Sequence, residues 1–140
     1  MQPSLEMTVD AGLMTAAHEW YDVSVRLSHS MDDALAVRMD LFSPEDAAPM
    51  ATWVFGRDLL ATGLLLPAGE GDVRVRPHGD RATDVELVSE ATWCVVRIAS
   101  AHVRDLVSRT RSAEERWRGT APAELDRALA GILTHGIRND

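Results

Sequence analysis

Apolar and polar residues alternate one by one through much of the first hundred positions, which is the period of a strand that buries one face. The alternation predicts about seven strands, near residues 5–13, 23–28, 35–41, 53–55, 72–76, 85–89 and 93–98. A polar turn at residues 30–33 joins the second and third strands into a hairpin. The last strand is apolar on both sides, so we expect it in the middle of a sheet or at an interface.

Two regions between these strands have less regular patterns. Residues 15–22 include Trp20 and Tyr21, whose side chains belong either to the core or to an exposed apolar patch. Residues 43–49 contain two prolines and are predicted to form a loop, because proline cannot donate a hydrogen bond to a neighbouring strand.

From Ser100 onward the apolar period becomes helical. Ser100 is a candidate N-cap for a helix that buries Val103, Leu106 and Val107. Residues 110–120 are polar apart from Trp117 and are predicted as frayed helix or loop. A second helix begins at Pro122, where proline suits the first helical position, and ends at Gly136. Its apolar stripe consists of Leu125, Ala128, Leu129, Ile132 and Leu133.

The most strongly patterned stretch runs from Trp53 to Pro77 and predicts a strand, a short helix, a Gly/Pro loop and a strand. Residues 57–61 are good helix formers, and Gly63 is placed to end the helix in a left-handed conformation. In the second strand, Val73 and Val75 face inward and the two arginines between and after them face outward. The stretch contains no nucleophile beside a base and no metal-ligand spacing, which favours a structural role.

Two sets of residues have both a structural and a functional interpretation. Asp58 suits the positive end of the short helix and Arg57 is expected to pair with an acid, although both could instead contact a partner. Trp117 and the stripe that includes Leu125 and Leu129 could form a partner groove, but such a stripe is more often core. We favour the structural interpretation in both cases.

Length and composition are those of one soluble domain spanning residues 1–140, with strands over about 5–98 and helices over about 100–135. The chain has no apolar run of membrane-spanning length and no basic N-terminal region typical of a signal peptide. Its one cysteine excludes an internal disulfide. We therefore expect a cytoplasmic protein without direct membrane insertion.

The charge balance weighs against two classes of partner. The chain has 22 acidic and 14 basic residues, a formal net charge of −8. Binding to nucleic acid phosphates or to anionic lipid requires clustered Lys and Arg.

The residue types that support catalysis are present but are not arranged for it. The five histidines do not pair at metal-binding spacing, and Cys94 lies within an apolar strand, which is typical of a buried thiol. The acidic pairs at 32–33 and 45–46 lie in predicted turns, and the glycines at 69 and 71 have no lysine or helix after them to bind phosphate. We predict no catalytic residues, no cofactor and no metal.

The Trp53 stretch resembles the SsgA-like family of actinobacterial sporulation and cell-division proteins. Its motif has the form W-V-F-x-R-D-L-L-x-x-G, followed by a Gly-rich turn and then G-D-V-R-V. The matching residues are Trp53, Val54, Phe55, Arg57, Asp58, Leu59, Leu60, Gly63, Gly71, Asp72, Val73, Arg74 and Val75.

The resemblance implies a fold and a function. The fold is α+β, a strongly twisted, barrel-like antiparallel sheet with C-terminal helices, similar to whirly-type single-stranded nucleic-acid-binding proteins and assembled as a trimer. The function is non-enzymatic: members help localise the tubulin-like protein FtsZ to division septa, together with other family members, and the short chain favours the core FtsZ-recruiting member. The alternative is a single-stranded nucleic-acid binder, and the partner-binding candidates are Arg57, Trp117, Leu125 and Leu129.

Overall fold

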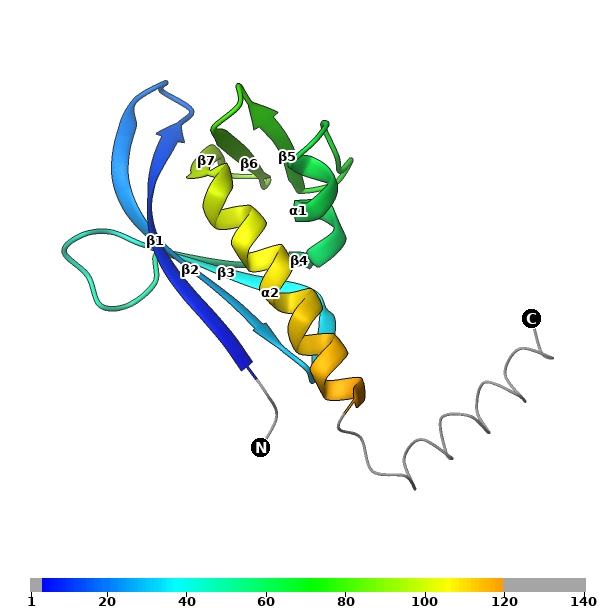
Figure 1. Ribbon diagram of the computed structural model, residues 1–140. Coiled ribbons are helices and arrows are strands. Elements are labelled where there is room, and N and C mark those ends of the chain that lie inside the picture. Colours follow the sequence, from blue (N-terminus) through cyan, green and yellow to red (C-terminus); the bar gives the residue numbers. More distant parts are fainter. Residues whose placement is uncertain (1–3, 120–140) are drawn as a thin grey trace.

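A computed structural model describes residues 4–119 of the chain. It consists of seven strands and two helices in an α+β arrangement, with a short helix after the fourth strand and a long helix after the last (Figure 1). The elements are β1 (Ser4–Thr15), β2 (Trp20–Ser30), β3 (Asp33–Phe42), β4 (Ala51–Gly56), α1 (Arg57–Gly63), β5 (Val73–His78), β6 (Ala82–Val88), β7 (Trp93–Ala99) and α2 (Ser100–Gly119).

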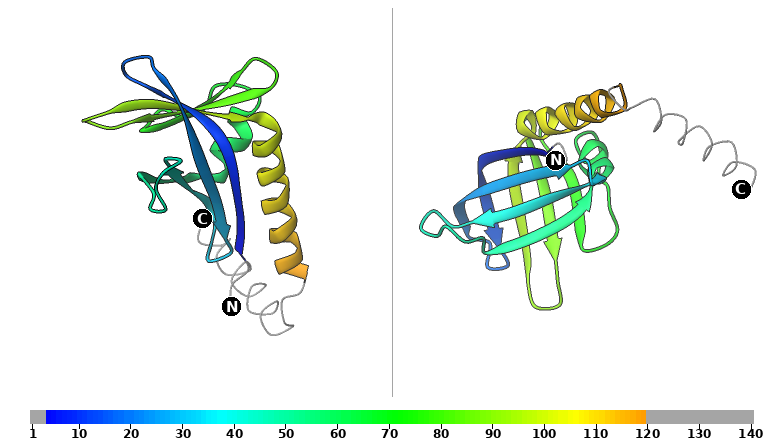
Figure 2. Two further views of the ribbon diagram at one scale, coloured as in Figure 1. Left: turned by 90° about the vertical axis from the view of Figure 1, so that its left-hand side faces the viewer. Right: turned by 90° about the horizontal axis from the view of Figure 1, so that it is seen from below.

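The seven strands form one antiparallel sheet in the order β4-β3-β2-β1-β7-β6-β5. The chain therefore builds two meanders, β1 to β4 and β5 to β7, that meet where β1 pairs with β7. This junction is short and runs from Gly12↔Arg97 to Thr15↔Cys94, whereas β1 and β2 pair along most of their length. The sheet curls into a half-barrel, as Figure 2 shows.

The core lies on the inner face of the curled sheet and is closed by the helices. Each strand contributes alternate apolar side chains, including the fully buried Leu27, Met39 and Val85. The helix α2 contacts β1, β6, β7 and α1, and it buries Val103, Leu106 and Val107 as the helical period predicts. The strand β7 lies inside the sheet, and Val95 and Val96, which point to opposite faces, are both fully buried. Its apolar character on both sides is thus explained by its central position.

Three sequence-based expectations differ from the structure. The strand β2 begins at Trp20 rather than near residue 23, and residues 16–19 form a tight turn. Of the two alternatives for Trp20 and Tyr21, the exposed one is correct, since they are 46% and 50% exposed. Residues 110–119 are not a frayed helix or loop but continue α2. Ser100 begins α2, and its hydroxyl lies 2.7 Å from the Thr83 hydroxyl in the core.

The third difference concerns Gly63, which does not adopt a left-handed conformation. It is the last residue of α1, and the following Leu64 is a right-handed C-cap with φ −64°. Glycine is needed here for another reason: a Cβ on residue 63 would lie 2.5 Å from the Cβ of Val75 on β5. The helix and the strand therefore approach each other more closely than any side chain at position 63 would allow.

The predicted second helix, with Leu125 and Leu129, lies outside the described residues. Trp117 belongs to the last turn of α2, but its side chain is also outside the described part. Neither α1 nor α2 is long and apolar enough to cross a membrane.

Candidate functional site

The motif stretch is mainly part of the scaffold. Phe55, Leu60 and Val75 belong to the core, and Trp53 and Val73 are half-buried against it. These residues come from β4, α1 and β5, so the motif attaches the short helix to the inside of the sheet. This agrees with the structural interpretation of the pattern.

The other motif residues lie at the ends of these elements. Asp58 is exposed in the first turn of α1, where a carboxylate interacts favourably with the helix dipole. Gly71 and Asp72 are exposed just before β5, and the Asp72 carbonyl accepts a hydrogen bond of 2.8 Å from the backbone N–H of Val88. This bond joins the start of β5 to the end of β6.

Arg57 connects the motif to the C-terminal helix. Its Nη1 donates a hydrogen bond of 2.6 Å to Oε2 of Glu114 on α2, which lies 57 positions later in the chain. Both side chains are largely buried, with 11% and 17% of their surfaces exposed. Because its guanidinium is occupied in this way, Arg57 is better suited to hold α2 in place than to meet a partner.

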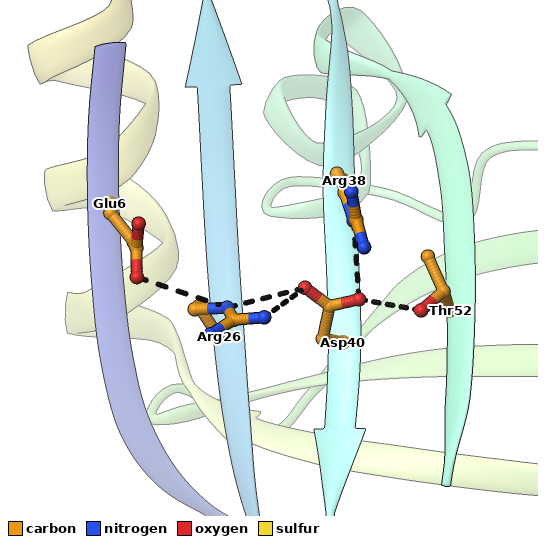
Figure 3. Close-up of polar contacts among 5 residues, drawn as sticks. All are labelled: Glu6, Arg26, Arg38, Asp40 and Thr52. Atoms are coloured by element: carbon orange, nitrogen blue, oxygen red, sulfur yellow. Dashed lines mark hydrogen bonds and ion pairs between the residues drawn. The ribbon is translucent and has the colours of Figure 1, made fainter. Parts of the chain in front are cut away.

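The outer face of β1 to β4 carries a row of interlocked charges (Figure 3). Asp40 lies at its centre with only 1% of its surface exposed, although it is on the face away from the core. Arg26 donates to its Oδ2 from Nε and Nη2 at 3.2 and 3.1 Å. The Thr52 hydroxyl donates to Oδ1 at 2.6 Å, and Arg38 Nε donates to the same oxygen at 3.2 Å.

These partners keep Asp40 ionised. Burial by itself raises the pKa of the carboxyl group, but the hydrogen bonds from Thr52, Arg26 and Arg38 outweigh burial and hold the pKa below its ordinary value. The ionised carboxylate accepts hydrogen bonds on both oxygens, so it is not available as a general base.

A second cluster of the same construction lies on the outer face of the other meander. Asp84 is 2% exposed, and Arg97 donates to its two oxygens at 2.7 and 2.9 Å. The Arg97 guanidinium lies 4.6 Å from the centre of the Trp20 ring, just as that of Arg26 lies 4.9 Å from the Phe42 ring. Hydrogen bonding to Asp84 raises the pKa of Arg97.

These clusters connect neighbouring strands on the outer face of the sheet. In each, a buried carboxylate is paired with an arginine that is covered by an aromatic ring. Within residues 4–119 no three His, Cys, Asp or Glu side chains are arranged to hold a metal ion. Burial raises the pKa of Cys94, the half-buried cysteine on β7, so its thiol is a poor nucleophile.

A groove between α1 and α2 was not predicted from the sequence. It has a volume of about 460 Å³ and is lined by Ala61, Leu64, Leu65, Arg104, Val107, Ser108, Arg111 and Ser112. Leu65 and Leu66 beside it are 81% and 54% exposed, among the largest apolar exposures on the described surface. The run of three leucines from residue 64 to 66, directly after a glycine, is the signal in the sequence that could have identified it.

Comparison with known proteins identifies matches over most of the chain. The family model described as "Streptomyces sporulation and cell division protein, SsgA" matches residues 23–115. This range includes the complete motif stretch, the groove and both outer-face clusters, except for Trp20 and for Glu6, whose Oε1 lies 3.8 Å from Arg26 Nε.

Among curated proteins, the chain is similar to several named sporulation-specific cell division protein SsgB. It is 28% identical to that of Streptomyces coelicolor over 136 residues, which cover 95% of this chain and 98% of that protein. It is 37% identical to that of Kineococcus radiotolerans over 135 residues, covering 93% of this chain and 80% of the relative. With the Saccharopolyspora erythraea protein the identity is 34%, and this chain spans 62% of its length.

Two solved structures have the same fold. One is the SsgA-like sporulation-specific cell division protein of Thermobifida fusca, with a TM-score of 0.71 and 26% identity over 96% of each chain. The other comes from a study that links SsgB mutations to longitudinal cell division during sporulation of Streptomyces coelicolor, with a TM-score of 0.71 and 26% identity over 81% of this chain. Both support the curled antiparallel sheet with its helices.

Proposed function

Because the chain belongs to the SsgA family of sporulation and cell division proteins, we propose that it helps localise FtsZ to division septa during sporulation. The observation that carries the proposal is the match to SsgB along almost the whole length of both chains. A role in cell division follows from the family itself, and FtsZ is the partner that the motif resemblance implies.

The chemistry of the surface supports a protein that acts by contact, without catalysis. The two most buried acids of the outer face, Asp40 and Asp84, are each neutralised by an arginine. Neither of these two carboxylates is therefore free to act as an acid or a base. Other division proteins and family members are the remaining partners that we propose, with the protein in the cytoplasm at the septum.

We also propose that the protein is a homotrimer. The apolar pattern on both faces of β7 could indicate an interface between copies of the chain. In the structure, however, both faces are covered within the monomer. The trimer therefore rests on the family resemblance. Sedimentation velocity at micromolar concentration tests it, and a monomer would contradict it.

Co-sedimentation with FtsZ polymers tests the central proposal. We expect this protein in the pellet with assembled FtsZ and in the supernatant without it, and we expect it to add no GTP hydrolysis of its own. A pellet without enrichment would refute direct FtsZ recruitment. The family's role in division would then have to operate through another partner.

A further inference from the structure

The groove between α1 and α2 has an apolar floor and a charged rim. Ala61 and Leu64 from the α1 side face Val107 from α2, and the exposed Leu65 forms its edge. The α2 side adds two hydroxyls, Ser108 and Ser112, at the spacing of one helical turn. An apolar surface of this kind gains from being covered by an aliphatic side chain.

The rim carries two arginines that have no partner within the described part of the chain. Arg104 and Arg111 both line the groove, and neither forms an ion pair or hydrogen bond with any residue from 4 to 119. Two acids of α2 are already engaged, since Asp105 pairs with Arg109 and Glu114 pairs with Arg57. Glu115, one helical turn after Arg111, is exposed and leaves a net positive charge on the groove. In a chain with a net charge of −8, two arginines on one apolar groove, neither paired with a described residue, form a local site that is complementary to negative charge.

We propose that this groove binds an acidic, leucine-bearing segment of a partner protein. The two arginines are seven positions apart on α2, which corresponds to about 10 Å along the helix. Carboxylates seven residues apart on a partner helix span the same distance and lie on the same face of that helix. An aliphatic side chain between these carboxylates then covers Leu64 and Val107.

This inference rests on the proposed function only for the identity of the partner as a division protein. The recognition itself follows from the groove, and it predicts binding that weakens as salt is added, because exposed ion pairs are screened. Two arginines also distinguish an acidic segment from a neutral or basic one, since a lysine placed on either would be repelled.

Selection from a displayed library of random 16-residue peptides tests the inference with the full chain as bait. We expect enriched peptides to carry two acids with an aliphatic residue between them. The Arg104→Glu/Arg111→Glu double variant should bind them at least about tenfold more weakly. The matched control is Arg76→Glu/Arg81→Glu, which changes the net charge equally at two exposed arginines on and beside β5 and should bind like wild type.

Each other outcome overturns the proposal. Enrichment of neutral or basic peptides, or equal binding by the groove variant and the control, would show that the arginines do not select the ligand. A change in sedimentation coefficient of the groove variant alone would show that a second copy covers the groove. The double variant Leu125→Ser/Leu129→Ser gives a further outcome. If this variant selects acidic peptides and wild type does not, residues 122–136 of the chain itself occupy the groove.

FtsZ co-sedimentation separates this inference from the proposed function. If wild type enters the FtsZ pellet and the groove variant does not, the proposed function and the groove inference are both supported. If both enter it equally, FtsZ binds elsewhere, and the groove is not the site of that contact. If neither enters it, FtsZ recruitment fails, while the peptide selection still decides the groove.

Discussion

Gly63 at the end of α1 packs directly against Val75 of β5, so closely that an added Cβ would lie 2.5 Å from the valine Cβ. Both residues belong to the same family motif, and the Gly/Pro loop between them returns the chain for this contact. Glycine is therefore required at position 63 by its close packing against Val75, and not by the backbone conformation at the end of the helix.

We predict that Gly63→Ala destabilises the protein by about 1–3 kcal/mol, as expected for overpacking. Helix propensity alone would make Gly63→Ala more stable than wild type, because alanine is favoured over glycine in a helix. Gly71→Ala is the control, since a Cβ there meets no atom within 4 Å. Chemical denaturation measures both, and a Gly63→Ala variant as stable as wild type would contradict the close approach.

Loss of one partner of the Arg57–Glu114 pair should be costly. We expect Arg57→Ala to lower the free energy of unfolding by about 3 kcal/mol, because it removes the Nη1 donor from the largely buried Glu114 carboxylate and breaks the link between α1 and α2. Arg109→Ala removes an exposed pair with Asp105 on the same helix and should change stability by less than about 1 kcal/mol. Equal effects in urea denaturation would show that Arg57 does not hold α2.

Asp40 should make the stability depend on acid pH. Its pKa is lowered in the folded protein, so the stability it contributes is complete above the pKa of the unfolded chain and is lost as pH falls towards the folded value. We expect Asp40→Asn to be about 2 kcal/mol less stable than wild type at pH 7, and this difference should shrink below about pH 4. Asp10→Asn, at an exposed position on β1, is the control. Urea unfolding measures the stability difference between Asp40→Asn and wild type at each pH. A difference that is the same at pH 7 and below about pH 4 would show that the ionised carboxylate is not specifically stabilised.

Trp53→Ala should cost less than the loss of a fully buried ring. A completely buried tryptophan would give about 3–5 kcal/mol, but Trp53 is half-buried against the core, so we expect about 2 kcal/mol. Val54→Ala, at a position that is 63% exposed on the same strand, should have little effect. A thermal melt of Trp53→Ala within one or two degrees of wild type would make the ring a candidate for partner binding.

We predict no appreciable binding of single-stranded DNA or RNA at physiological salt. Trp20 and Tyr21 offer exposed rings on which bases could stack, but a phosphate track is also needed. Arg26 and Arg97, the best-placed outer-face arginines, are committed to Asp40 and Asp84. Fluorescence anisotropy with labelled oligonucleotides of mixed sequence should show no binding at micromolar protein. Binding that weakens steeply with salt would instead favour the whirly-type function.

The regular part of the fold could be predicted from the sequence because its elements are encoded locally. Alternation of apolar residues located the strands, and the two apolar faces of β7 indicated its central place. The continuation of α2 could not be predicted in this way, since residues 110–119 are polar. It depends on tertiary contacts, namely Thr110 buried in the core and Glu114 bound by Arg57.

The polar clusters escaped prediction for a different reason. Outward positions on a half-buried strand are expected to be solvated, and acids there look unremarkable in the sequence. Their burial follows from register, which places Arg26 opposite Asp40 and Arg97 opposite Asp84. The groove likewise forms only because α1 and α2 lie side by side. In the sequence these helices are separated by three strands, so no local pattern indicates their contact.

The short junction between β1 and β7 has a consequence for how the chain reaches this structure. Each meander is assembled from neighbours in the sequence, so its hairpins can form quickly and independently. Pairing of Thr15 with Cys94 instead closes a loop of roughly 80 residues, whose entropic cost is recovered only when the contact is made. Joining of the two meanders should therefore limit the folding rate, and the amide protons that bond between β1 and β7 should become protected from exchange later than those of the β2–β3 hairpin.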